Sequence, residues 1–344
     1  MVIDRIMART WDENILFSAL FELTFACNLR CFYCYNDLGS SGEPLTLDEY
    51  NKVLRELAEM QVMNLTLSGG EPLAHRHFFE IGQRARELGF VARIKSNGHA
   101  LNEEIARRLR AEVDPFIIEL SLHGATAETH DRQTRVEGSF ERLTGNIEAM
   151  VDVGLRVKLN CALTRWNEAE VEDLFAIAEK LGVQVSINST LTPRDDGDLT
   201  PLDIAATDEG VRRLHEEHLR RSGGGGEAHS ECHETPSVTK ICGAGSSTIA
   251  IDPFGEVFPC VQWRRSIGNV RRSSIHEIWE ESPAVHEARR ISQAAKEKMD
   301  GLGEAARDTM HCMGLAEELT GDPLKTDPGS LRNAELMRSV REEM

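Results

Sequence analysis

The stretch "FELTFACNLRCFYCYNDLG", residues 21–39, decides both the fold and the chemistry expected of this chain. A strand-like apolar run leads directly into Cys27, Cys31 and Cys34, spaced C-x₃-C-x₂-C. Structural zinc sites take four ligands, and no fourth follows Cys34 at zinc spacing. Disulfides use cysteines in pairs, so an odd set of three fits neither use. Three thiolates do suit a four-iron cluster that leaves one iron open for a small molecule.

The composition limits the partners and the compartment. The 344 residues carry a formal net charge of −18, which argues against nucleic acid or an anionic membrane as the main partner. The N-terminus has no apolar signal core, and no run approaches the roughly 20 apolar residues that span a bilayer. We therefore expect a cytoplasmic protein, with no nucleic-acid or membrane partner, whose eight cysteines are reduced and serve mainly as metal ligands.

Strand and helix patterns alternate through about residue 205. The strand candidates are 15–25, 63–68, 90–96, 116–122, 155–163 and 183–190. The helix candidates lie around 46–60, 75–88, 102–111, 139–153 and 168–181. Successive β-α units of this kind build a parallel sheet, either open and doubly wound or curled into a partial barrel.

Side-chain alternation favours the partial barrel. A parallel sheet covered by helices on both faces is apolar on both faces, whereas one face of these strands is polar. The polar set is Glu22, Thr24, Thr66, Ser68, Glu119, Ser121, His123, Lys158, Asn160, Gln184, Ser186 and Asn188. A half-exposed sheet with one solvated face is the alternative. We expect an α/β protein with a partial (β/α)₆ barrel whose interior is polar.

The pattern changes after the barrel segment, and four units are expected. Residues 1–206 form the barrel, and 207–239 form a polar helix and a glycine-rich linker. Residues 240–328 form a small C-terminal domain, whose segment "STIAIDPFGEVFPC", 247–260, predicts a hairpin turning at Pro253 and Gly255. Residues 329–344 read as a charged helix or tail.

The cysteine loop matches a known signature. Cys27, Cys31, Tyr33 and Cys34, on the loop after the first strand, resemble the motif of the radical S-adenosylmethionine (SAM) superfamily. The resemblance implies that the three thiolates hold a [4Fe–4S] cluster. It also implies that the open iron is chelated by the amino and carboxylate groups of SAM, and that Tyr33 lies beside the adenine.

Other strand ends carry motifs of the same family. The segment "LSGGEP", 67–72, resembles the family motif that binds the amino group of SAM, here through Gly69, Gly70 and Glu71. A Gly-Gly turn permits close backbone approach to a ligand, and a carboxylate accepts from an ammonium group. The cofactor contacts expected from the later strands are Ser96, Asn97, Ser121 and Asn160.

Catalytic candidates come from the expected lumen. Glu119 and His123 are the candidates for proton transfer or for binding polar groups of the substrate, and Glu22 and Lys158 share that face. Each also fits an internal polar network, and His123 departs from the Asp or Tyr common in relatives. Cys161 has the opposite parity, so we expect a buried, inert thiol rather than a hydrogen-atom donor.

The remaining cysteines suggest a second iron–sulfur site. The spacing Cys242-x₁₂-Gly255-x₄-Cys260 resembles the opening of the SPASM auxiliary domain that follows many radical SAM barrels. The later cysteine run of a full SPASM module is missing, and only Cys312 lies in that region, so two full auxiliary clusters are not expected. One cluster on Cys242, Cys260 and Cys312 is expected, with Cys232 or a substrate atom as fourth ligand. A degenerate module kept for packing or docking is the alternative.

The resemblance implies an oxidoreductase-type enzyme that cleaves SAM reductively to a 5′-deoxyadenosyl radical, which abstracts a hydrogen atom from the substrate. The SPASM character favours a maturase of ribosomally made peptides that oxidises, cross-links or epimerises residues. A radical dehydrogenase or tailoring enzyme for a small molecule, such as a carbohydrate or antibiotic precursor, is the runner-up. A non-catalytic iron–sulfur redox or scaffold protein is a third hypothesis, against which the Gly69–Glu71 motif argues.

The expected partners follow from this chemistry. A flavodoxin- or ferredoxin-type protein is the usual electron donor by resemblance. Because Cys27 lies so near the start, we expect no leader-binding domain before the barrel. A peptide substrate would then be recognised through a separate leader-binding protein or through the auxiliary module.

Overall fold

A curved sheet of parallel strands forms the centre of the molecule. The computed structural model describes residues 2–37, 39–222, 238–303 and 309–344. The parallel strands are β1 (Ser18–Glu22), β2 (Asn64–Ser68), β3 (Val91–Ser96), β4 (Ile117–Ser121), β5 (Val157–Ala162) and β6 (Gln184–Asn188). Each pairs in parallel with the next along the chain. All six strands expected from the sequence are confirmed.

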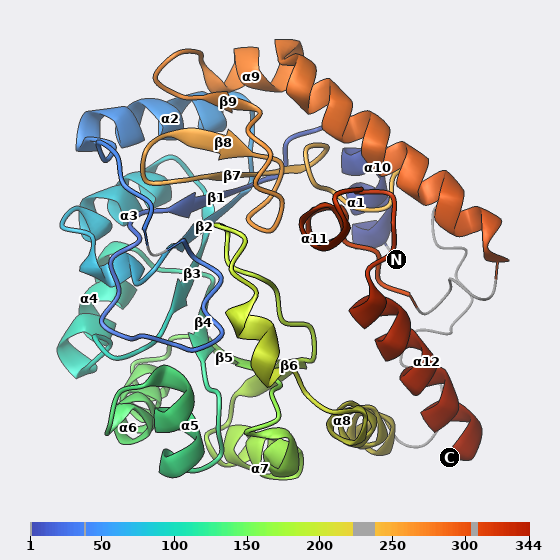
Figure 1. Ribbon diagram of the computed structural model, residues 1–344. Coiled ribbons are helices and arrows are strands. Elements are labelled where there is room, and N and C mark those ends of the chain that lie inside the picture. Colours follow the sequence, from blue (N-terminus) through green and yellow to red (C-terminus); the bar gives the residue numbers. More distant parts are fainter. Residues whose placement is uncertain (1, 38, 223–237, 304–308) are drawn as a thin grey trace.

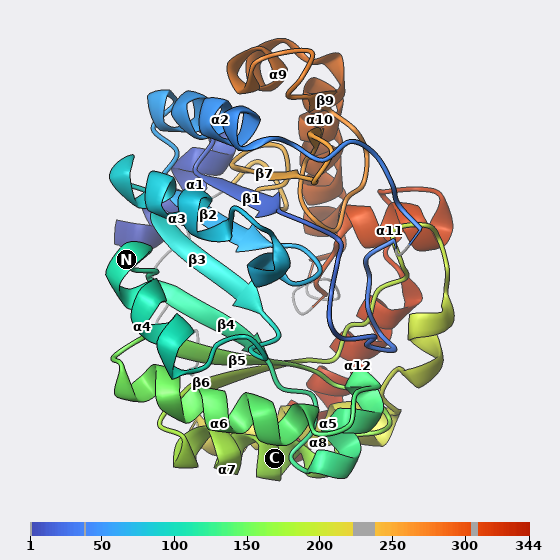
Figure 2. The same cartoon turned by 90° about the vertical axis from the view of Figure 1, so that its left-hand side faces the viewer.

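Helices cover the outer face of this sheet (Figures 1 and 2). They are α2 (Leu47–Glu59), α3 (Phe78–Glu87), α4 (Glu103–Glu112), α5 (Ala127–Thr134), α6 (Ser139–Asp152) and α7 (Val171–Lys180). Short 3₁₀ turns lie at η1 (Pro72–Ala74), η2 (Glu168–Glu170) and η3 (Thr200–Ile204). The sequence did not predict α5, nor the N-terminal helix α1 (Val2–Asp12). The helix α5 is short and strongly polar, which leaves little hydrophobic periodicity to detect. The helix α1 is amphipathic, and its pattern in the first twelve residues was overlooked.

The C-terminal domain continues the barrel sheet instead of standing apart. Its strands are β7 (Thr248–Ile251), β8 (Glu256–Phe258) and β9 (Gly268–Asn269). The predicted hairpin is confirmed as the antiparallel pair β7–β8, and β7 also pairs in parallel with β1. The strand order is β6-β5-β4-β3-β2-β1-β7-β8-β9, so β6 and β9 are free edges and the barrel stays partial.

Helices make up the rest of the C-terminal half. They are α8 (Asp208–Arg221), α9 (Ile275–Glu281), α10 (Pro283–Gly301), α11 (Met313–Thr320) and α12 (Pro328–Glu343). Thr207 caps α8, the polar helix expected after residue 206, with its side chain accepting from the backbone N–H of Gly210. The C-terminal helix is confirmed as α12, which packs beside α8 (Figure 1). The long helix α10 was not predicted. Among the described residues, no helix combines the length and apolarity needed to cross a bilayer.

The strand alternation separates a core from a lumen as expected. Phe21, Leu67, Ile94, Leu120 and Leu159 are at most 1% exposed and pack against the helices. On each strand, the residues that alternate with these core residues face the concave side of the sheet. On β6 that side is open, because Gln184, Ser186 and Asn188 are exposed. The polar interior is therefore walled by β1–β5 and accessible past β6.

Candidate active site

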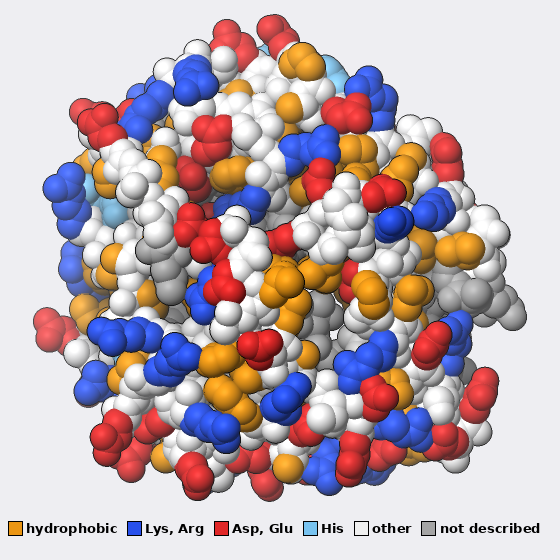
Figure 3. All heavy atoms as spheres, in the orientation of Figure 1, with side chains coloured by type: hydrophobic (Ala, Val, Ile, Leu, Met, Phe, Trp, Pro, Cys, Tyr) orange, Lys and Arg blue, Asp and Glu red, His pale blue; other side chains and the backbone are white. Residues whose placement is uncertain are grey.

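The motifs predicted from the sequence meet in one cavity of about 510 Å³ at the carboxyl ends of the strands. Figure 2 shows the strand arrows pointing toward this side, where the segment between β1 and α2 crosses. Figure 3 shows the corresponding face hollowed near its centre, with acidic and basic side chains around it. The predicted residues that line the cavity are Cys27, Cys31, Tyr33, Cys34, Gly69, Gly70, Ser96, Asn97, Glu119, Ser121, His123 and Asn160.

The three cysteines lie on a tight loop after β1. The N–H of Cys34 donates to the carbonyl of Cys31 (3.2 Å), and the Asn97 amide lies 3.6 Å from the sulfur of Cys27. Burial raises the pKa of all three thiols, that of Cys31 to about 12. Free thiols here stay protonated at neutral pH, so iron binding must displace their protons. The three thiols therefore suit ligands that become thiolates only when iron binds.

The two glycines of the second motif are required by close backbone packing. Gly69 has φ 127°, and a Cβ there would lie 2.3 Å from the carbonyl oxygen of Thr24. A Cβ on Gly70 would lie 2.6 Å from the carbonyl oxygens of Phe25 and Ala26. Only glycine fits at either position. The β2 turn is thus pressed against the start of the cysteine loop.

Glu71 lies behind the cavity wall rather than in it. Its buried carboxylate accepts from the Ser96 hydroxyl (2.9 Å) and from the N–H groups of Asn97 (2.8 Å) and Leu73 (3.2 Å). Burial raises the pKa of this carboxyl, although these donors pull it down. Glu71 therefore fixes the end of β3 against the β2 turn. Its direct contact with a cofactor amino group stays a prediction.

Asn36 is a site residue that the sequence analysis missed. Its side chain is 3% exposed and lines the cavity, and its Nδ2 donates to the carbonyl of Gly69 (3.4 Å). The buried Oδ1 has no hydrogen-bond partner. A buried acceptor without a donor costs about 1–3 kcal/mol, so it is a natural point for a donor group of a ligand. Its position two residues after Cys34 is the sequence feature that could have identified it as a site residue.

Glu119 and Asn160 form a polar floor to the cavity. The Asn160 amide donates to the Glu119 carboxylate (3.0 Å). Lys95 and Arg93 each lie 3.6 Å from the same carboxylate. Glu119 is therefore a charge-paired group that faces the lumen, as expected. Lys95 lines the cavity as well but was not singled out from the sequence.

His123 is a buried neutral ring beside Tyr33. Its Nδ1 accepts from the N–H of Ala162 (3.1 Å), and its ring centroid lies 4.5 Å from that of Tyr33. Burial, with the nearby His130, lowers its pKa well below the usual range. The ring therefore suits positioning of Tyr33 better than proton transfer at neutral pH. The catalytic role of His123 stays a prediction.

Cys161 points away from the lumen, as its parity predicted. It is 2% exposed, belongs to the hydrophobic core and accepts from the Asn167 amide (3.4 Å). Burial raises its pKa well above that of a free thiol. This geometry fits a structural thiol.

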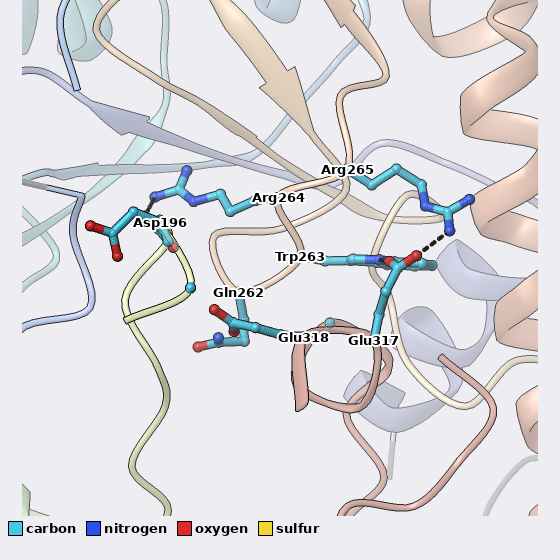
Figure 4. Close-up of a pocket in the computed structure, with 10 residues that line it drawn as sticks. Asp196, Gln262, Trp263, Arg264, Arg265, Glu317 and Glu318 are labelled. Carbon is cyan, nitrogen blue, oxygen red and sulfur yellow. Dashed lines mark hydrogen bonds and ion pairs between the residues drawn. The ribbon is translucent and has the colours of Figure 1, made fainter. Parts of the chain in front are cut away.

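A buried ion triad joins the barrel to the C-terminal domain. Arg264 makes two hydrogen bonds to Glu22 (2.6 and 2.9 Å) and one to Asp195 (2.6 Å). Glu22 is fully buried, so it serves this pairing and does not face a substrate as a free lumen group. Arg264 also borders a second pocket of about 480 Å³. Figure 4 shows Arg264 and Arg265 pointing in opposite directions there, with Arg265 paired to Glu317.

Three cysteines also come together in the C-terminal domain. Cys242, Cys260 and Cys312 are half-buried and close enough for their charges to interact. Burial first, and then the neighbouring thiols, raise the pKa of Cys242 to about 11 and that of Cys260 to about 12. Cys232 lies outside the described residues. Within the described chain, no three Cys, His, Asp or Glu side chains converge as around a single metal ion.

The cavity and its cysteine loop define the class of protein. The chain belongs to the radical SAM superfamily: residues 21–178 match the family model "Radical SAM superfamily". Residues 242–302 match the SPASM model, described as an iron–sulfur cluster-binding domain. It is therefore a radical SAM enzyme with a [4Fe–4S] cluster, SAM and an auxiliary iron–sulfur domain.

Two relatives and one solved structure illustrate the match. The AdoMet-dependent heme synthase of Methanosarcina barkeri is 30% identical, over 89% of this chain and 94% of that protein. The mycofactocin maturase MftC of Mycobacterium ulcerans is 30% identical, over 88% of this chain and 84% of that protein. The structure of native anSMEcpe with bound AdoMet and Cp18Cys peptide has a TM-score of 0.69 at 16% identity. The superposition covers 95% of this chain and 97% of that chain. At this low identity, the likeness is evidence for the fold and not for the function.

The residues present fit the cofactors of this family. Three thiols of one loop, a glycine turn in close contact with that loop and the unpaired Oδ1 of Asn36 line a single cavity. Thiolates are the ligands that iron–sulfur clusters take. The non-catalytic scaffold hypothesis is set aside, since the chain belongs to an enzyme family.

Proposed function

We propose that this radical SAM enzyme is a maturase that modifies a ribosomally made peptide. The observation that carries the proposal is the shape of the lumen. The cavity with the cofactor-binding motifs reaches Asn160 on β5, and on the neighbouring edge strand β6 the residues of the same face, Gln184, Ser186 and Asn188, are exposed. An extended chain can follow an open polar strand face, whereas a small ligand that must be enclosed gains less from such a face.

The similarity findings support a peptide substrate. The mycofactocin relative is named a maturase, and the anSMEcpe structure holds a peptide together with AdoMet. When bound, the cluster and SAM supply a radical able to remove a hydrogen atom from an unactivated carbon. The chain itself orients the reacting group, through Glu119, Asn160 and Ser121 on the cavity floor. It also limits water at the cysteine loop through the half-buried Tyr33 and the buried Asn36.

A small-molecule substrate is the second candidate. The match to the heme synthase extends over 94% of that protein, whereas the match to the mycofactocin maturase extends over 84% of the maturase. The ring of a tetrapyrrole would need the same open lumen. The electron donor we propose in either case is a flavodoxin or ferredoxin.

The test uses anaerobically reconstituted, chemically reduced protein with SAM. The probe is the peptide encoded by the nearest short reading frame beside the gene. We expect 5′-deoxyadenosine to form together with a mass change in the peptide. A peptide returned unchanged, while a porphyrin precursor is modified under the same conditions, would overturn the proposal in favour of the second candidate.

A further inference from the structure

The inner faces of β3, β4 and β5 carry more positive than negative charge. In the sheet register Lys95 pairs with Glu119, and Glu119 pairs with Lys158. Arg93 lies two residues before Lys95 on the same face. These strands thus present three cations and a single carboxylate to the lumen. The surplus contrasts with the net charge of −18 for the whole chain.

The contacts within the protein do not use up this charge. Glu119 sits between Lys95 and Arg93, each at 3.6 Å. The buried Nε of Arg93 has no hydrogen-bond partner. The side chain of Lys158 makes no ion pair or hydrogen bond within the described part of the chain. Lys95 and Arg93 keep 49% and 41% of their side-chain surface exposed, so a ligand can reach them.

The cations lie between the cofactor cavity and the free edge of the sheet at β6. Lys95 lines the cavity that holds the cysteine loop. Lys158 borders a separate pocket of about 410 Å³ with Gln184 and Ser186 of the edge strand β6. Figure 2 shows β3 to β6 side by side and running in one direction. A substrate lying across the inner face from β6 would meet Lys158 first and Lys95 next, because the sheet register runs from Gln184 through Lys158 and Glu119 to Lys95.

We propose that Arg93, Lys95 and Lys158 form a cationic ledge that binds a carboxylate of the substrate and so directs it toward the cavity. The partly exposed ammonium groups suit a carboxylate, which both can contact by charge-assisted hydrogen bonds. Glu119 lies between Lys95 and Lys158 and offsets part of their positive charge, so the ledge keeps the charge for about one substrate carboxylate. This rests on the proposed function for the source of the carboxylate, an acidic residue of the peptide. A propionate-bearing tetrapyrrole offers the same chemistry.

The experiment measures which compounds the reconstituted holoenzyme retains in the presence of SAM. The probes are two pools of short capped peptide amides, with Glu or Gln at one fixed position, and coproporphyrin. Mass spectrometry of the retained fraction gives the Glu-to-Gln ratio. The variants are Lys158→Gln and Lys95→Gln. Lys180→Gln, an exposed lysine at the end of α7, is the matched control with the same change in net charge.

The wild type should retain the Glu pool about fivefold over the Gln pool, as expected for a partly solvated charge-assisted contact. The preference should fall toward parity in both ledge variants and persist in Lys180→Gln. Equal retention of the two pools by the wild type, or a preference that survives both ledge variants, overturns the ledge but leaves the peptide function standing. Retention of coproporphyrin that depends on Lys158, without retention of either peptide pool, supports the ledge and overturns the peptide function. Retention of no probe overturns the ledge.

Discussion

The two cysteine sites of this chain differ in how their ligands are brought together. Cys27, Cys31 and Cys34 lie on one loop, and a glycine turn from the next strand packs directly against it. Cys242, Cys260 and Cys312 come from distant segments of a domain in which β7 pairs with β1 and α11 packs against α10. The first site is a local motif with a rigid support. The second depends on the tertiary fold, and the described residues supply three of its predicted ligands.

The largest expected effect is at the barrel site. Cys31→Ala should abolish SAM cleavage, because the cluster loses a protein ligand that nothing nearby can replace. The measurement is 5′-deoxyadenosine formed by the reduced protein. Cys161→Ala is the matched control, since that thiol is buried in the core, and it should retain cleavage. Full activity in Cys31→Ala would contradict the assignment.

The next largest effect concerns the joint between the two regions. Arg264→Met should lower the free energy of unfolding by about 3–5 kcal/mol, because it leaves the fully buried Glu22 without its partner. Denaturant unfolding measures this. Arg265→Met removes an adjacent, partly exposed ion pair and should cost less than about 1 kcal/mol. Equal losses in the two variants would show that the joint does not depend on the buried triad.

The glycine turn can be tested with a single methyl group. Gly70→Ala should reduce SAM cleavage about a hundredfold, because its Cβ would push the cysteine loop away from the β2 turn. Gly145→Ala in α6 is the control, since a Cβ there meets nothing within 4 Å. It should leave cleavage intact and slightly stabilise the helix. Wild-type cleavage by Gly70→Ala would mean that the loop tolerates displacement.

The auxiliary site gives a smaller, stoichiometric effect. Reconstituted wild type should hold about eight irons per chain, from two four-iron clusters. Cys260→Ala should hold about four and still cleave SAM, since its cluster is not the one that binds the cofactor. Iron analysis combined with the cleavage assay measures both. About four irons in the wild type would identify the auxiliary cysteines as packing residues.

The smallest effect is a pH dependence of stability from Glu318. Burial raises the pKa of this carboxyl to about 7, and nearby Asp195 adds to the shift. Folding therefore favours the protonated form, so this contribution to stability is present below about pH 4.5 and is lost as the pH rises through about 7. Melting temperatures over this window should fall less in Glu318→Gln than in the wild type. Glu128→Gln, an exposed control, should follow the wild type. Parallel curves for Glu318→Gln and the wild type would contradict the shift.

The barrel was largely predictable because its signals are local. Period-2 alternation located all six parallel strands, and it placed Cys161 outside the lumen and Asn160 inside. The motifs at the strand ends converge because the carboxyl ends of parallel strands share one edge. The Cys31 loop and the Gly70 turn needed no long-range information.

The features that were missed are set by tertiary contacts. The pairing of Glu22 with Arg264 joins residues 242 positions apart, and no spacing rule connects them. The hydrogen bonds of the Glu71 carboxylate to Ser96 and Asn97 were likewise not foreseen, whereas its contact with the cofactor stays a prediction. Asn36 could have been noticed beside the cysteine motif, although its unpaired oxygen is visible only in the fold. The extension of the sheet by β7 was likewise not evident from the hairpin pattern.

The most direct test of the account is electron paramagnetic resonance of the reduced protein with Cys242, Cys260 and Cys312 replaced by alanine, recorded with and without SAM. The account predicts a single [4Fe–4S] signal that changes on addition of SAM, with coupling to a ¹⁵N label in its amino group. A signal that is identical with and without SAM would show that the polypeptide saturates the cluster of Cys27, Cys31 and Cys34. The site would then have no open iron for the cofactor.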